Sequence, residues 1–122
     1  MNLRLSKNFL AREFRCRCDQ CEFTGQQMNP DFVDFLQQVR TIFDREMLIL
    51  SAIRCPAHNR RVGGKTQSFH TLGRAVDVAV VDPYLRHELM RIVLDMGGTC
   101  GVYSTFIHID NRKNPLVFYG GS

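Results

Sequence analysis

Two histidines and one aspartate stand at spacings that suit a metal site. Asp77 lies seven positions after His70, and His108 follows in the C-terminal part of the chain. Imidazole and carboxylate groups are the ligands of catalytic zinc sites, in which three protein groups bind the ion and a fourth position stays open. The ion lowers the pKa of a water at that position to about 7, which supplies hydroxide at neutral pH. If the three side chains converge, the sequence predicts a zinc hydrolase.

The surroundings of Asp77 strengthen this interpretation. The apolar, β-branched run 75–81 predicts a strand buried on both faces, with Asp77 inside it. Burying a carboxylate costs several kcal/mol unless a partner compensates the charge, and a metal ion would do so. Gly73 allows the backbone to turn between His70 and Asp77.

A family resemblance rests on these same residues. Residues 68–77 have the pattern Ser-x-His-x-x-Gly-x-Ala-x-Asp, and His-x-Asp follows at 108–110. This combination resembles the M15 family of zinc peptidases, which includes D-alanyl-D-alanine carboxypeptidases, murein endopeptidases and phage endolysins. Residues 50–59 and 62–64 also resemble the segment that precedes the metal motif in that family. The resemblance extends over residues 14–110, which is most of the chain.

The resemblance implies roles for several side chains. His70, Asp77 and His108 would bind one catalytic zinc ion. Arg54 would stand near the scissile bond, where a guanidinium can stabilise the oxyanion or hold a substrate carboxylate. Ser68 is expected either to support the site or simply to make a turn with its hydroxyl.

The general base departs from the family pattern. In well-characterised M15 relatives an acidic residue lies three positions before the last zinc histidine, where this chain has Thr105. Asp110 is the nearest carboxylate, and residues two apart on a strand point to the same face. Asp110 is therefore expected either to accept a proton in catalysis or to hold His108 in place from its outer side.

Cysteines form a second group with metal-ligand character. Cys16, Cys18 and Cys21 are densely spaced, and Cys55 precedes the metal motif. Four thiolates could bind a structural zinc ion, although this spacing is not that of a standard paired knuckle. Free thiols and a disulfide are the alternatives, and the sequence leaves all three open.

Local patterns predict the elements that position these groups. Asn29 and Pro30 begin a helix, and apolar residues at helical spacing continue it to Phe43. A second helix begins at 82–83 and ends at 97–98. The expected strands are 47–53, 75–81, 99–103, 105–109 and an edge strand at 116–119. The fold class is therefore α+β, a small and mainly antiparallel sheet flanked by helices. The resemblance implies the hedgehog/D-Ala-D-Ala-peptidase type of this class.

Composition sets the outer limits. The 122 residues are enough for one domain, 1–122, and 44% apolar with 23% charged residues is ordinary for a globular protein. The net charge of +4 is spread without a basic run, so no nucleic-acid partner is predicted. No apolar run reaches the ~20 residues of a membrane span, and the N-terminus has no secretory signal pattern. We expect synthesis in the cytoplasm and, for work at the cell wall, export by a phage holin or within a virion.

These observations support one leading hypothesis and two others. The first is a zinc peptidase that cuts stem or cross-link peptides of bacterial peptidoglycan, in a phage or prophage lysis context. The second is a non-catalytic module that binds cell wall or a partner and keeps the metal as a structural element, which Thr105 favours. The third is a hydrolase of free dipeptides with the same metal site. The sequence does not fix the cleaved bond or the oligomeric state.

Overall fold

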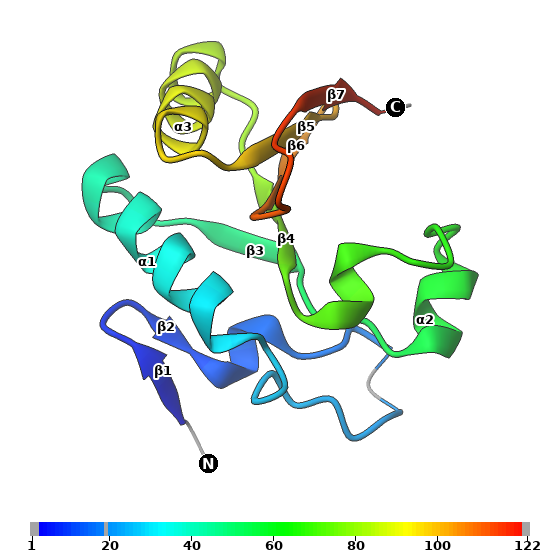
Figure 1. Cartoon of the computed structure of the whole chain (residues 1–122). Helices are drawn as coiled ribbons and strands as arrows, with labels where there is room; N and C mark the ends of the chain where they lie inside the picture. The colour runs from blue at the N-terminus through cyan, green and yellow to red at the C-terminus, as the bar shows by residue number, and fades with distance from the viewer. Residues whose placement is uncertain (1–2, 19, 121–122) are drawn as a thin grey trace.

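The computed structural model describes residues 3–18 and 20–120. Short strands and two long helices follow one another along the chain (Figure 1). In chain order the elements are β1 (Arg4–Ser6), β2 (Phe9–Leu10), the 3-10 turn η1 (Ala11–Phe14), α1 (Pro30–Phe43), β3 (Leu48–Ser51), α2 (Pro56–Arg61), the 3-10 turn η2 (Phe69–Leu72), β4 (Ala75–Ala79), α3 (Pro83–Asp95), β5 (Thr99–Val102), β6 (Phe106–Asp110) and β7 (Val117–Tyr119).

Both long helices begin in the way that their sequences predict. The Asn29 side chain accepts a hydrogen bond from the amide of Phe32, with Pro30 in the first turn of α1. Asp82 caps α3 in the same way through the amide of Leu85. An oxygen at the N-cap satisfies an amide that has no partner within the helix, and proline at the next position loses nothing.

Five strands form the main sheet in the order β3-β4-β6-β5-β7. All neighbours are antiparallel except β5 and β7, which run parallel. The two central strands pair in a register that places Asp77 opposite His108. Because side chains alternate along a strand, these two residues share one face while Val76 and Val78 of β4 point to the other.

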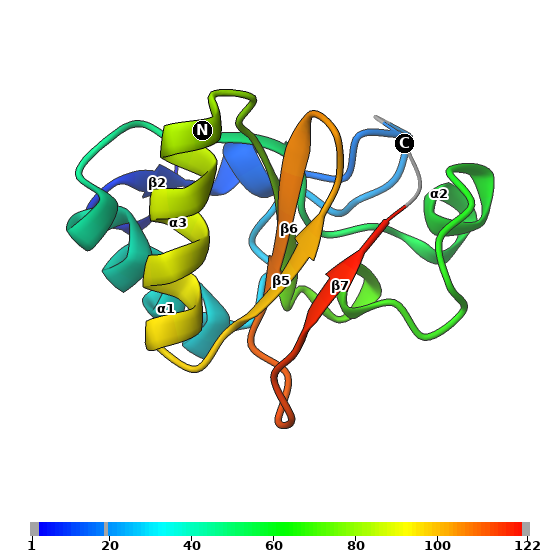
Figure 2. The same ribbon diagram turned by 90° about the horizontal axis from the view of Figure 1, so that it is seen from above.

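The two faces of the sheet have different covers. Helices α1 and α3 lie together on one side, and α2 with η2 lies on the other (Figures 1 and 2). The side covered by α1 and α3 holds the apolar core, where Phe32, Leu36, Leu89 and Ile107 are fully buried. The opposite side carries the polar residues Asp77 and His108 of the two strands.

The α+β prediction is confirmed, and so are the two long helices and the five strands of the main sheet, which end within a few residues of the expected bounds. Two local features were not predicted. The loop after Arg54 contains the short helix α2, and the turn-rich N-terminal segment contains the β1–β2 hairpin and η1. Both are short elements held by contacts with distant parts of the chain, such as the hydrogen bond that the Ser6 hydroxyl donates to Oε1 of Gln37. None of the described helices has the length and apolarity of a membrane span.

Candidate metal centre and active-site cleft

Asp77 and His108 meet because β4 and β6 are neighbours in register. The Nδ1 atom of His108 lies 3.2 Å from Oδ1 of Asp77. Both side chains are buried, with 6% and 8% of their residue surfaces exposed. Two rigid strands therefore fix two of the predicted ligands.

His70 reaches the same point from η2. The Ser68 hydroxyl accepts the amide N–H of His70 at 3.1 Å and caps the turn, while Gly73 ends it with a φ of 68°. Nδ1 of His70 lies 2.8 Å from the carbonyl oxygen of Ala52, which can only accept. Nδ1 is therefore the protonated nitrogen, and Nε2 keeps its lone pair. That Nε2 lies 3.2 Å from Oδ1 of Asp77 and has no hydrogen-bond partner although it is buried.

This arrangement fits a zinc ion. A tetrahedron with zinc–nitrogen and zinc–oxygen distances of 2.0–2.1 Å has edges of about 3.3–3.4 Å. The two distances to Asp77 are both 3.2 Å, and the ligand atoms of His70, Asp77 and His108 all lie within 4.8 Å of one another. The partnerless Nε2 of His70 is the kind of buried atom that a metal satisfies. Three protein ligands leave one position of the tetrahedron open.

Asp110 holds His108 from its outer side. Its Oδ2 lies 2.7 Å from Nε2 of His108 and accepts Nη2 of Arg112 at 2.6 Å. Its Oδ1 accepts the backbone amide and Nε of Arg112. With Nε2–H donated to Asp110, His108 offers Nδ1 to a metal, and this partner fixes the ring. The carboxylate has no exposed surface, and both of its oxygens are occupied, which favours the holding role over that of a proton acceptor.

The carboxyl groups of the site stay ionised. Burial acts to raise the pKa of Asp77, but the imidazoles of His108 and His70 outweigh it and hold that pKa well below its usual range. For His108, burial acts to lower the pKa, whereas hydrogen bonds with Asp110 and Asp77 raise it above the usual value. A cation at Nδ1 would take the place of the proton that these carboxylates stabilise.

Arg54 is locked beside the ligands. Its guanidinium donates to the Ser51 hydroxyl at 3.2 Å, to Oδ1 of Asn59 at 3.2 Å and to Oδ2 of Asp77 at 3.3 Å. Asn59 is buried and is itself fixed through its bond to the Lys65 carbonyl at 2.7 Å. A guanidinium has five N–H groups, so about two remain for a substrate oxygen.

Asn59 was not predicted as a site residue. It stands in the segment that carries the family resemblance, and only the fold reveals its contact with Arg54.

A cleft of about 810 Å³ opens over the predicted ligands. One wall is the loop after α2 with the turn η2, and the other comes from β6, β7, the loop between them and Tyr103. Asp77 is the one carboxylate among the described residues that line it, against three cations, Arg54, Lys65 and Arg112. The aromatic residues of the lining are Phe69, Tyr103, Phe106, Phe118 and Tyr119.

Thr105 lies away from this chemistry. It is exposed in the turn between β5 and β6 and is not among the described residues that line the cleft. Tyr103, two positions earlier, does line the cleft and stacks on Phe106 with ring centroids 4.4 Å apart. Apart from its place at a strand end, no sequence pattern indicated a role for Tyr103.

The four cysteines also come together. Cys16, Cys18 and Cys21 lie in the segment between η1 and α1, and Cys55 is the N-cap of α2. Their sulfur atoms lie within 4.8 Å of one another, and all four are free thiols. This cluster is separate from the cleft, whose lining includes none of them.

Comparison with known proteins agrees with the geometry. A family model described as Peptidase M15 matches residues 7–110. The match covers most of the chain and includes every predicted zinc ligand, so the resemblance stated from the sequence is confirmed. No curated protein matches the chain.

Proposed function

The chain belongs to the peptidase M15 family, and from this premise we propose that it is a zinc-dependent peptidase that hydrolyses peptide bonds of bacterial peptidoglycan. One observation carries the proposal. Nε2 of His70 and Nδ1 of His108 each lie 3.2 Å from Oδ1 of Asp77, close to the edge length of a zinc tetrahedron, and all three residues line one cleft.

The residues around the ligands support hydrolysis. When bound, zinc would polarise a carbonyl oxygen and lower the pKa of a water to about 7. Asp77 and the two histidines hold the ion, and Asp110 keeps the His108 ring in its ligating orientation. Arg54 presents its remaining N–H groups to the negative charge that develops on the carbonyl oxygen of a cleaved amide.

The charge of the cleft supports a substrate that carries carboxylates. Arg54, Lys65 and Arg112 outnumber the single acid Asp77 in its lining. Stem peptides of peptidoglycan carry free carboxylates along their length, and a cationic cleft attracts such groups. Free dipeptides share this property to a lesser degree, because they have fewer carboxylates for the basic residues to hold.

The biological setting of this proposal is lysis by a phage or prophage. The proposed lysis role rests on the proposed substrate, peptidoglycan. The proposal includes delivery of the chain to the cell wall by a holin or within a virion. Lysis of cells that co-express the chain with a holin, and survival of cells that express a ligand variant instead, would test it.

A second function is favoured by the composition of the cleft. Apart from the predicted ligand Asp77, none of the described lining residues is a carboxylate, and Thr105 stands outside it. A general base is ordinarily within hydrogen-bond reach of the proton that it takes. A module that binds wall peptides in the same cleft without cutting them would need no such group.

A digest of purified peptidoglycan and soluble muropeptides, followed by mass spectrometry, separates the two functions. The zinc-loaded chain is compared with chelator-treated protein, with Asp77→Ala and with Asp95→Ala, which changes an exposed acid of α3. A defined fragment released by the wild type and by Asp95→Ala alone would support the peptidase and identify its bond. Retention of intact muropeptides without any cleavage would support the binding module.

A further inference from the structure

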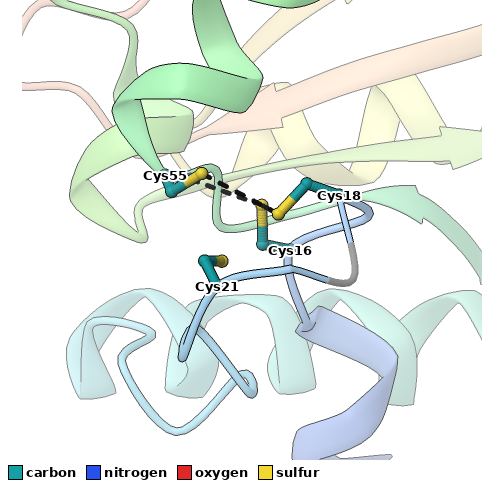
Figure 3. A group of neighbouring side chains, drawn as sticks. All are labelled: Cys16, Cys18, Cys21 and Cys55. Carbon is teal, nitrogen blue, oxygen red and sulfur yellow. Dashed lines mark hydrogen bonds between the residues drawn. The ribbon is translucent and has the colours of Figure 1, made fainter.

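The cysteine cluster joins two segments that are distant in the sequence. Figure 3 shows Cys16, Cys18 and Cys21 on the N-terminal segment and Cys55 on the loop that leads into α2. Cys16 and Cys55 are buried, Cys18 is partly buried and Cys21 is exposed. The cluster therefore lies at the edge of the molecule, with two of its cysteines buried and the other two nearer to solvent.

The four sulfur atoms lie within 4.8 Å of one another, and two of their separations are close to those between the ligands of one zinc ion. Sγ of Cys18 lies 3.6 Å from Sγ of Cys16 and 3.9 Å from Sγ of Cys55. A tetrahedron with zinc–sulfur distances of 2.3 Å has edges of about 3.8 Å. A disulfide joins two sulfur atoms at about 2.05 Å and would leave the other two thiols of the group without a role.

Backbone amides point at the sulfur atoms. The amide of Gln20 donates to Sγ of Cys18, and the amide of His58 donates to Sγ of Cys55, each at 3.4 Å. Cys16 accepts the amide of Cys55, also at 3.4 Å.

Three of the four sulfur atoms therefore accept a backbone amide. Such donors stabilise thiolates, which are the form of cysteine that binds metals. Four thiolates this close repel one another unless a cation lies between them.

We propose that Cys16, Cys18, Cys21 and Cys55 bind a structural zinc ion, separate from the catalytic site. Four thiolates fill a tetrahedron and leave no open position, which is the pattern of structural zinc. Thiolate ligands in this geometry select zinc or iron among the available metals. The absence of these residues from the lining of the cleft agrees with a role in holding the fold.

The ion would hold the segment that carries Arg54. Cys55 follows Arg54 directly, and the Ile53 amide already donates to the carbonyl of Phe14 at 3.3 Å. A metal link between Cys55 and the 16–21 segment fixes both sides of this contact. Binding of a structural ion contributes directly to folding, so its loss would loosen the strand-to-helix connection beside the cleft.

The test starts with the full-length chain purified under reducing conditions. Elemental analysis counts zinc per chain, and cobalt substitution reports sulfur ligands through thiolate-to-cobalt charge-transfer absorption. We expect about two zinc ions in the wild type and about one in Cys18→Ala and in Cys21→Ala, because each loses a ligand of a four-thiolate site. Cys100→Ala, which changes a buried cysteine of β5 outside the cluster, keeps about two.

The cobalt spectrum of the wild type tests the proposal even if the cysteine variants do not fold, and it requires no enzyme activity. The cobalt spectrum of the wild type and of Asp77→Ala retains the thiolate charge-transfer band, because that substitution changes only the catalytic site. A wild type without this band, with five reactive thiols, with a disulfide in the cluster or with iron as its native metal would overturn the proposal. A wild type with the band and one zinc ion would support it and would count against zinc at His70, Asp77 and His108.

Discussion

The two candidate metal-ligand clusters of this chain are built in opposite ways. His70, Asp77 and His108 number three, and two of them stand on neighbouring strands in the lining of a cleft. The four cysteines stand on irregular segments outside the cleft. Three ligands leave a position open for chemistry, whereas four thiolates close the site and serve the fold. In this account, rigid strands set the geometry where the proposed reaction takes place, and the proposed ion would take the place of secondary structure where strands are absent.

The clusters are connected through two consecutive residues. Arg54 donates to Asp77 in one cluster, and Cys55 belongs to the other. This connection makes the comparison testable, because changes in the two clusters are expected to affect different properties. Ligand changes at the open site should stop hydrolysis and leave the fold intact, whereas the closed site should act through the fold.

The largest expected effect is that of removing Asp77, whose Oδ1 lies beside both histidines. Asp77→Ala should lower the hydrolysis of muropeptides by at least about 10³-fold, because the activated water and the polarised carbonyl both depend on the ion. One zinc ion should remain, on the cysteines. Rates, zinc content and thermal unfolding of the variant are the measurements, with Asp95→Ala as the control. Full activity in a variant that lacks the site zinc would contradict the account.

Substitution of Arg54 should have the next largest effect, because this residue acts on the transition state and does not bind the ion. Arg54→Ala should lower kcat about 10²–10³-fold, as expected for the loss of an oxyanion donor. Its zinc content should stay close to that of the wild type. Arg91→Ala, which removes an exposed arginine paired with Glu88 and Asp95, is the matched control. An unchanged kcat would show that Arg54 serves only to hold Asp77.

Asp110 should have an intermediate effect, carried by His108. Asp110→Asn should weaken zinc binding at the open site about 10–100-fold, because the neutral amide no longer orients and polarises the imidazole. A competition titration with a chromophoric chelator measures the change, and Asp95→Asn controls for the lost charge. Activity that returns at saturating zinc would confirm the holding role. Unchanged zinc affinity with abolished kcat would point instead to proton transfer by Asp110.

The smallest expected effect concerns the position where relatives carry an acid. Thr105 is exposed and away from the cleft, so Thr105→Glu should change activity by less than about 2-fold, as do most surface substitutions. The measurement is the same muropeptide assay. A rise of about 10-fold or more would mean that a carboxylate at this position does reach the reacting groups.

The sequence predicted much of the architecture because its signals are local. Asn29 and Pro30 begin α1, Asp82 with the following proline begins α3, and the apolar residues repeat at helical spacing. The buried run that contains Asp77 identified the central strand of the site. In each of these cases the residue types alone restrict the backbone or the burial.

The features that the sequence did not predict depend on contacts between residues that are distant in the chain. The contact of Nδ1 of His108 with Asp77 follows from the pairing of β4 with β6, which spacing does not specify. The role of Asn59 depends on where α2 turns relative to Arg54. The convergence of Cys55 with the N-terminal cysteines likewise needs the contacts of Arg17 with β3 and of Cys16 with the start of α2.

Graded removal of zinc tests the comparison most directly. Increasing chelator is added to the wild type while residual zinc, muropeptide hydrolysis and secondary structure are followed in the same samples. The account predicts that hydrolysis disappears with the first ion, while about one zinc per chain and the native secondary structure persist, because the open site exchanges its metal and the closed one does not. Loss of both ions together, or hydrolysis that fails only when the chain unfolds, would contradict the division between a reactive and a structural site.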